Sequence, residues 1–235
     1  MRNVERGIAH RGDLRNYPEN TLSAFESAYR IGFKRIEFDV NMTKDGVPVV
    51  IHDPTLDRTT NATGLVKQYT WEQLKQFKIE EDERIPSLEE VLLALKGKVT
   101  MHIELKQIGH LYPGLEEKVI ELLRKTDTYD QATLSSIDHY SLVKCRSVDE
   151  HIPLTPLIFG RTPSIFEFAK ELKSKSIGLY FRYITPDYVD ECEKHGISPG
   201  AATVNREEDL RHFIADPRVL ICTEELELYK SLVNA

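Results

Sequence analysis

Three carboxylates stand on one face of two predicted strands. Glu37 and Asp39 lie two residues apart in the first of these strands, and Glu104 lies in the second. Residues two apart on a strand point to the same side, and the residues between and beside the first two are apolar: Ile36, Phe38 and Val40. Buried carboxylates are costly without a partner. Because all-oxygen ligation favours a hard cation over zinc, we expect Glu37, Asp39 and Glu104 to hold one Mg²⁺ or Ca²⁺ ion.

Two histidines and two basic residues complete a set that suits phosphate-ester chemistry. His10 and Arg11 close the first predicted strand, His52 follows a predicted hairpin, and Lys106 ends a later strand. Imidazole titrates near neutral pH, so His10 and His52 are the candidate acid and base. Arg11 and Lys106 supply positive charge for an anionic substrate. We expect His102 to be a packed core residue and the remaining histidines to be structural.

The elements that must position these residues alternate along the whole chain. Predicted strands cover 8–10, 35–41, 99–106, 131–136, 152–159, 177–182, 197–204 and 219–223. Predicted helices cover 20–31, 87–95, 115–125, 138–149, 163–173, 186–195, 206–215 and 224–233. This alternation indicates a parallel sheet with crossover helices. Eight units in 235 residues favour a closed (β/α)8 TIM barrel over an open doubly wound sheet, with the active site at the carboxyl ends of the strands.

One interval departs from the alternation. After the second strand, Thr43-Lys44-Asp45-Gly46 precedes a second extended run, which is a hairpin signal. The chain from there to Pro86 is largely polar. We therefore expect 42–86 to form a hairpin and a small insertion that caps the barrel mouth, within a single domain of residues 1–235.

Composition excludes several classes of protein. The 31 Lys and Arg residues against 38 Asp and Glu residues give a net charge of −7, which argues against a nucleic-acid partner. There is no apolar run long enough for a membrane span and no apolar core of a secretory signal. Three widely spaced cysteines fit no metal motif and favour a reducing compartment. We expect a cytoplasmic protein without integral membrane contact, of unspecified oligomeric state.

Seven motifs in order resemble those of the glycerophosphodiester phosphodiesterases: His10-Arg11-Gly12, Pro18-Glu19-Asn20-Thr21, Glu37-x-Asp39, Asp45-Gly46-x-Pro48-Val49-x-x-His52-Asp53, Leu56-x-Arg58-Thr59-Thr60, Ile85-Pro86-Ser87-Leu88-Glu89-Glu90 and Glu104-x-Lys106. The match is dense to about residue 106, and the strand–helix rhythm extends it over the chain. The resemblance implies a (β/α)8 barrel and the roles given above to the three carboxylates, the two histidines, Arg11 and Lys106. It also implies that Glu19 lies at the edge of the metal site.

The carboxyl-terminal half departs from that family's pattern. Where the family commonly has Trp-Thr-Val-Asn, this chain has Ala202-Thr203-Val204-Asn205, and it has Ser136-Ile137 and Thr223-Glu224 in place of Ser-Phe and Thr-Asp. Loss of the Trp removes an aromatic wall from the barrel mouth. The differences concern the pocket for the alcohol and leave the metal and acid–base positions unchanged.

We therefore expect a metal-dependent hydrolase that cleaves a small-molecule glycerophosphodiester to sn-glycerol 3-phosphate and an alcohol. One alternative is a phospholipase D-like enzyme acting on lysophospholipid or sphingolipid headgroups. That enzyme requires an exposed apolar surface beside the mouth, for which the candidates near the polar stretch 59–64 are Leu65, Val66, Tyr69, Trp71 and Phe77. The other alternative is a non-catalytic phosphodiester-binding barrel, which is expected to have lost a histidine or a carboxylate that this chain retains.

Overall fold

Eight parallel strands close into a barrel in the computed structural model, which describes residues 3–80 and 83–234. The strands pair in the order β1-β2-β4-β5-β6-β7-β8-β9, and β9 returns to β1. Their bounds are β1 (Gly7–His10), β2 (Arg35–Met42), β4 (Thr100–Leu105), β5 (Ala132–Ser136), β6 (Leu154–Ile158), β7 (Ser176–Tyr180), β8 (Ser198–Ala202) and β9 (Leu220–Thr223). The closed order confirms the predicted TIM barrel.

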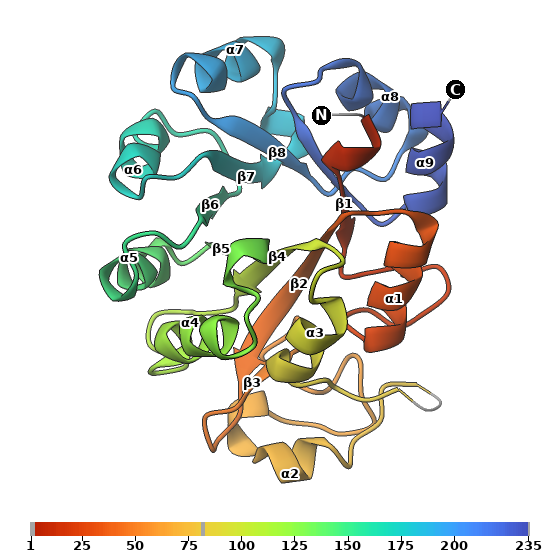
Figure 1. Ribbon diagram of the computed structural model, residues 1–235, viewed down its shortest axis with the longest axis vertical. Coiled ribbons are helices and arrows are strands. Elements are labelled where there is room, and N and C mark those ends of the chain that lie inside the picture. The colour runs from red at the N-terminus through yellow and green to blue at the C-terminus, as the bar shows by residue number, and fades with distance from the viewer. Residues whose placement is uncertain (1–2, 81–82, 235) are drawn as a thin grey trace.

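A ring of helices surrounds the strands (Figure 1). Its members are α1 (Leu22–Ile31), α3 (Leu88–Leu95), α4 (Leu115–Lys125), α5 (His139–Val148), α6 (Ile165–Glu171), α7 (Pro186–Lys194), α8 (Glu207–Ala215) and α9 (Leu226–Asn234). A capping box starts α3, because the Ser87 hydroxyl accepts from Glu90 N at 3.2 Å and the Glu90 carboxylate accepts from Ser87 N at 2.8 Å. The first helix starts later than predicted, since Thr21 caps it and Asn20 lies outside it.

The alternation in β2 separates the core from the interior of the barrel. Ile36, Phe38 and Val40 are fully buried and point outward to the helices, as Phe38 shows by packing on Phe25 of α1 with ring centroids 5.4 Å apart. Because side chains alternate along a strand, the residues between them point inward. The outward apolar residues therefore determine that the carboxylates of β2 face the barrel interior.

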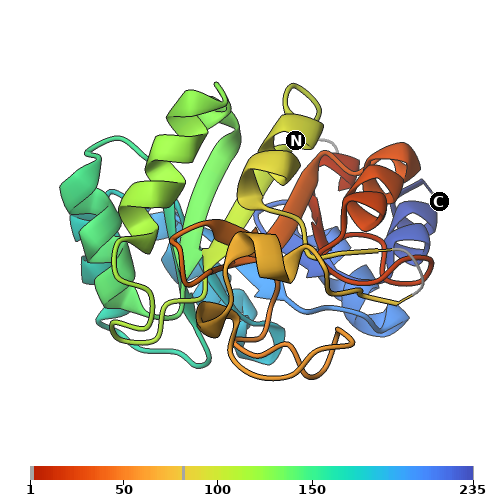
Figure 2. The ribbon, with the colours of Figure 1, turned by 90° about the horizontal axis from the view of Figure 1, so that it is seen from below.

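The segment between β2 and α3 is the inserted part of the chain, seen nearest the viewer in Figure 2. It begins with β3 (Pro48–Val50), which is antiparallel to β2, and includes the short helices η2 (Val66–Gln68) and α2 (Trp71–Leu74). It has a small core of its own, made of Val49, Ile51, Leu56, Val66, Leu74, Ile79 and Ile85. The hairpin after the second strand is as predicted, and its own core lets the segment hold a defined conformation at the barrel edge.

Arg6 ties the start of the chain to its end. It lies in η1 (Asn3–Arg6), just before β1, and is only 1% exposed. Its guanidinium donates to the carbonyl of Ile214 at 2.8 Å, in the last turn of α8, and to those of Asp216 at 2.7 Å and Val219 at 2.8 Å, between α8 and β9. These bonds hold β1 beside β9, where the barrel closes. Within the described residues, no helix combines the length and apolar character needed to cross a bilayer.

We predict that Arg6→Leu lowers the free energy of unfolding by about 3 kcal/mol, because it leaves buried carbonyls without a charged donor. Urea denaturation followed by circular dichroism measures this. The matched control is Arg30→Leu, which removes an exposed pair with Glu26 and should change stability by less than about 0.5 kcal/mol. Equal losses in the two variants would contradict a special role for Arg6.

Candidate functional site

Three carboxylates converge where β2 and β4 lie side by side. Asp39 and Glu104 are directly paired in the sheet, and His10 of β1 is paired with Glu37. One oxygen from each of Glu37, Asp39 and Glu104 lies within 4.8 Å of the others. The barrel therefore brings together all three residues that the sequence analysis assigned to a metal.

Glu37 is the least satisfied member of this cluster. Its Oε2 atom is buried and has no hydrogen-bond partner among the described residues, and His10 Nε2 lies 3.8 Å from it. Burial raises the pKa of Glu37 well above its usual value, and the charges of Asp39 and Glu104 raise it further. A divalent cation would offset both the cost of burying the Glu37 charge and its repulsion by Asp39 and Glu104. The Glu37 oxygen without a hydrogen bond therefore fits a metal ligand.

Asp39, in contrast, has one hydrogen-bond donor and two cationic side chains as partners. It is fully buried and accepts a hydrogen bond from Asn20 Nδ2 at 2.9 Å. Arg11 Nε lies 3.1 Å away and Lys106 Nζ 2.9 Å away. Burial alone would raise the pKa of Asp39, but Lys106 and Arg11 outweigh it and hold the pKa below its usual value. Arg11 and Asn20 both adopt left-handed backbone conformations, with φ of 57° and 61°, which turn these side chains toward Asp39.

The two basic residues leave the cluster close to neutral. Lys106 Nζ also lies 2.8 Å from Glu104 Oε1, so Lys106 and Arg11 offset two of the three carboxylates. One negative charge remains, and a divalent cation would change it to one positive charge. That residual charge would suit a phosphodiester, which carries a single negative charge.

His10 is oriented by residues that follow the last two strands, β8 and β9. Its Nδ1 atom lies 2.9 Å from Glu224 Oε1, and Glu224 Oε2 accepts from Asn205 Nδ2 at 2.7 Å. With Nδ1 donating to Glu224, Nε2 is the nitrogen that faces the carboxylate cluster. In the sequence, Glu224 stands out only as a departure from the resembled family's pattern, and this contact with His10 was not predicted. Its position directly after the strand that neighbours β1 was the available signal.

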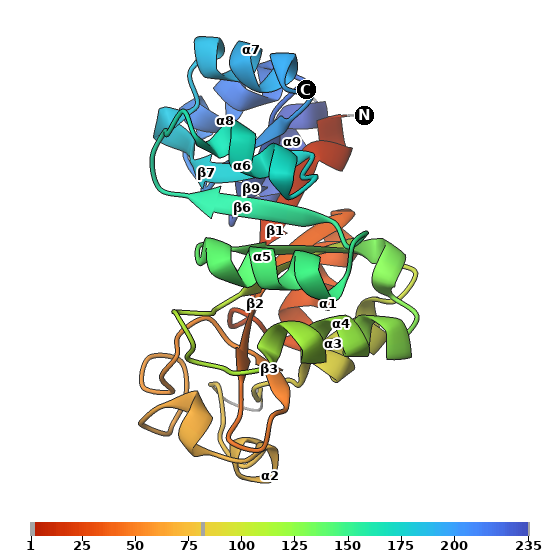
Figure 3. The ribbon, with the colours of Figure 1, turned by 90° about the vertical axis from the view of Figure 1, so that its left-hand side faces the viewer.

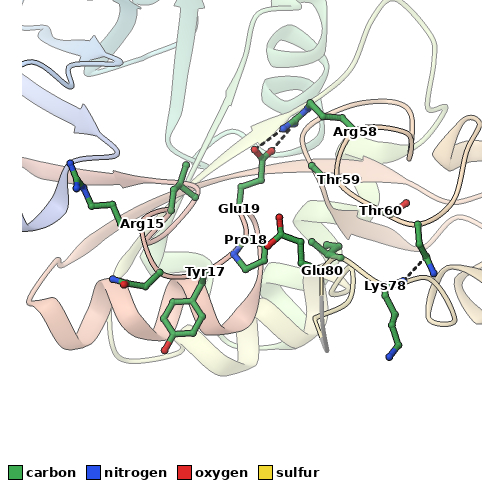
Figure 4. Close-up of a pocket in the computed structure, with 13 residues that line it drawn as sticks. Arg15, Tyr17, Pro18, Glu19, Arg58, Thr59, Thr60, Lys78 and Glu80 are labelled. Atoms are coloured by element: carbon green, nitrogen blue, oxygen red, sulfur yellow. Dashed lines mark hydrogen bonds and ion pairs between the residues drawn. The ribbon is translucent and has the colours of Figure 1, made fainter.

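His52 is oriented by residues from the insertion. Its Nδ1 atom lies 2.6 Å from Asp53 Oδ1, and Arg58 Nε donates to Asp53 Oδ2 at 2.6 Å. The hydrogen bond from Arg58 is the main cause that lowers the pKa of Asp53 to about 2. Arg58 also donates two bonds of 2.8 Å to Glu19 (Figure 4). Asp53 and Arg58 belong to the sequence motifs named above, but their contacts with His52 and with each other were not predicted.

Glu19 borders the carboxylate cluster through Arg11, and its place at the edge of a metal site stays a prediction. Glu19 pairs with Arg58 and with Arg11, whose guanidinium lies 3.2 Å from Glu19 Oε1, and it is not one of the three converging carboxylates. It also lines a groove of about 840 Å³ between the loop after β1 and the insertion, with mainly polar walls (Figure 4). Glu19 thus contacts two arginines: Arg11, which also contacts Asp39, and Arg58, which also contacts Asp53, the partner of His52.

His102 lies on the barrel interior and is outside the cluster, as predicted. Arg35 contacts its Nε2 atom at 3.3 Å, and burial, with a smaller effect of Arg35, lowers the pKa of His102 to about 3. It is therefore neutral at physiological pH. It lines a cavity of about 120 Å³ inside the barrel, which is also bordered by Ala202, the residue that replaces the Trp of the resembled pattern.

Comparisons with known proteins agree with this geometry. Residues 10–223 match the model of the Glycerophosphoryl diester phosphodiesterase family. The chain is 38% identical, over 97% of its own length and 97% of the relative's, to a glycerophosphodiester phosphodiesterase of Caldanaerobacter subterraneus subsp. tengcongensis. Among solved structures, it is similar to an Oleispira antarctica phosphodiesterase in complex with the product sn-glycerol-3-phosphate (TM-score 0.90, 24% identity, covering 97% of this chain and 96% of that one). It is also similar to a Thermotoga maritima glycerophosphodiester phosphodiesterase (TM-score 0.80, 25% identity, covering 97% and 98%).

We predict opposite effects of Glu37→Gln in the absence and presence of a divalent cation. In EDTA the variant should be as stable as the parent protein or more stable, because the substitution removes a buried charge. With millimolar Mg²⁺ or Ca²⁺ the parent protein should gain thermal stability by ligand linkage, and the variant should gain much less. Differential scanning calorimetry with and without the ion measures both effects.

The matched control is Glu26→Gln, which alters an exposed carboxylate on α1 and should respond to the ion as the parent protein does. An undiminished response of Glu37→Gln would show that Glu37 is not a ligand.

Proposed function

The chain belongs to the glycerophosphoryl diester phosphodiesterase family, and we propose that it performs that family's reaction at the barrel mouth with the residues described above. It is an enzyme that hydrolyses a glycerophosphodiester to sn-glycerol 3-phosphate and an alcohol. Water is consumed, its hydroxyl ending on phosphorus and its proton on the alcohol. The observation that carries the assignment of residues is the convergence of Glu37, Asp39 and Glu104. Beside them lies His10, which a fourth carboxylate, that of Glu224, orients.

We propose that Glu37, Asp39 and Glu104 hold one divalent cation, Mg²⁺ or Ca²⁺. The unpartnered oxygen of Glu37 and the all-oxygen donor set support a hard ion. Such an ion, when bound, polarises a phosphoryl oxygen and stabilises the charge that develops there. The protein's own contribution is to keep the three carboxylates together, with Asn20 and Arg11 fixing the orientation of Asp39.

His10 and His52 are the proposed acid and base. Each has a carboxylate at Nδ1, Glu224 for His10 and Asp53 for His52, which leaves Nε2 of each ring free to exchange a proton with the reacting oxygens. One histidine takes the proton of the attacking oxygen and the other gives a proton to the departing alkoxide. Arg11 and Lys106, both held among the carboxylates, are the proposed contacts of the phosphate.

The proposed place of action is the cytoplasm. Cys145, Cys192 and Cys222 are all free and buried, as suits a reducing compartment. The proposed partner is a small-molecule glycerophosphodiester. The acid–base and metal residues are all retained, which a barrel that only binds phosphodiesters would not need.

We predict that His10→Asn and His52→Asn each lower kcat on a glycerophosphodiester by about 10²–10⁴-fold, because each removes a proton-transfer group. Release of sn-glycerol 3-phosphate, coupled to its dehydrogenase, measures the rate. His212→Asn is the matched control, since His212 is an exposed residue of α8, and it should keep full activity. Near-full activity of either of the first two variants, folded and loaded with the ion, would overturn the two-histidine mechanism.

The identity of the ion has its own test. Crystals grown with each cation should show one ion contacting Glu37, Asp39 and Glu104, with metal–oxygen distances of about 2.1 Å for Mg²⁺ or about 2.3–2.6 Å for Ca²⁺. The ion that supports the higher kcat is the functional one. An ion bound at other residues would contradict the assignment of these ligands.

A further inference from the structure

A second groove, of about 450 Å³, begins at the candidate site itself. His52, Glu104 and Lys106 form its inner end, and apolar side chains form its walls: Pro54, Ile108, Ile137 and Phe159. It is therefore continuous with the proposed acid–base and phosphate residues. A molecule whose phosphate lies at Lys106 has this groove beside it.

The apolar side chains of the groove are unusually exposed. Ile108 is 68% exposed, Ile137 47% and Phe159 72%. They follow β4, β5 and β6, three neighbouring strands whose carboxyl ends open on the same face of the barrel. Figure 3 shows the arrowhead of β6 pointing to the left of the view, with the insertion that includes α2 at the bottom. Single exposed apolar residues are common, but a contiguous group beside a catalytic site indicates a binding surface.

The polar groups of this groove already have partners. Asp138 accepts from Gly109 N at 2.7 Å and from Tyr140 N at 3.1 Å. The Gln107 side chain donates to Tyr112 O at 2.9 Å and accepts from Tyr112 N at 2.8 Å. The outer part of the groove therefore offers few free polar groups to a ligand with hydroxyls.

The apolar residues of the insertion pack into its own core and do not form a surface at the mouth. Val66 is buried in the core of the insertion, and Tyr69, Trp71 and Phe77 are packed against it. The groove beside the insertion, at Glu19 and Arg58, has mainly polar walls. The exposed apolar side chains at the mouth are therefore on the loops after β4–β6, and the insertion residues named as candidates for such a surface are used in its core instead.

We propose that the groove at Ile108, Ile137 and Phe159 binds an apolar chain on the alcohol part of the phosphodiester. This inference rests on the proposed function. The glycerol part has two hydroxyls, whose burial against apolar walls is unfavourable, so the glycerol lies away from this groove and the alcohol lies in it. The preferred substrates are then sn-glycero-3-phosphoesters of alcohols with an alkyl or acyl chain.

The test is a series of sn-glycero-3-phospho-n-alkyl esters with ethyl, butyl and hexyl chains. Burial of one methylene contributes about 0.8 kcal/mol, so kcat/KM should rise by up to about fourfold per methylene. The double variant Ile108→Ser with Phe159→Ser should flatten this rise, so that kcat/KM falls much more on the hexyl ester than on the ethyl ester. Tyr140→Ser is the matched control, because Tyr140 is 87% exposed but lies outside the groove, and it should keep the rise.

The outcomes separate the two proposals. Failure to hydrolyse any ester, the ethyl ester included, would overturn the proposed function. Hydrolysis of the ethyl ester with a rate independent of chain length would overturn only the apolar subsite. A rise that occurs only above the concentration at which the hexyl ester forms micelles would also overturn it, since the groove would then attach to a lipid surface instead of binding one chain.

Discussion

The burial of three carboxylates at one point of the barrel is the constraint on which the rest of this structure depends. Glu37, Asp39 and Glu104 converge within 4.8 Å, where mutual repulsion and lost hydration both act against their charged forms. The chain offsets two of these charges with Lys106 and Arg11 and adds Asn20 to the most buried carboxylate. Glu37 keeps an oxygen without a hydrogen bond, and that unbalanced charge is what a cation would bind. Local stability is thus given up to create the site.

The same constraint explains why both histidines have carboxylate partners outside the strands of the cluster. His10 needs a partner that does not compete with Glu37, and barrel closure between β9 and β1 provides Glu224. His52 has Asp53, which accepts from Arg58 of the insertion, and Arg58 in turn donates to Glu19 of the loop after β1. Each imidazole is therefore oriented through Nδ1, so that Nε2 is directed to the mouth. The insertion thus supplies the residues that orient His52, in addition to extending the sheet.

The two grooves divide the mouth by polarity. The groove along Glu19 and Arg58 has mainly polar walls, and the groove along Ile108 and Phe159 has apolar ones. A glycerophosphodiester is itself divided into a polar glycerol phosphate and an alcohol of variable character. Because Ile108, Ile137 and Phe159 are at least 47% exposed, they add little to the core and are available to a ligand.

The sequence by itself determined the barrel and predicted the seven residues proposed for the site, because both depend on local patterns. The period of two in β2 places Ile36, Phe38 and Val40 outside and the carboxylates inside, and eight strand–helix units of ordinary length specify the closed sheet. Only the tertiary structure decided the partners: Glu224 for His10, Arg58 for Asp53 and Glu19, and the apolar groove. These contacts join residues up to 214 positions apart, so no local period encodes them. They exist because closure of the barrel brings the ends of distant strands to one face.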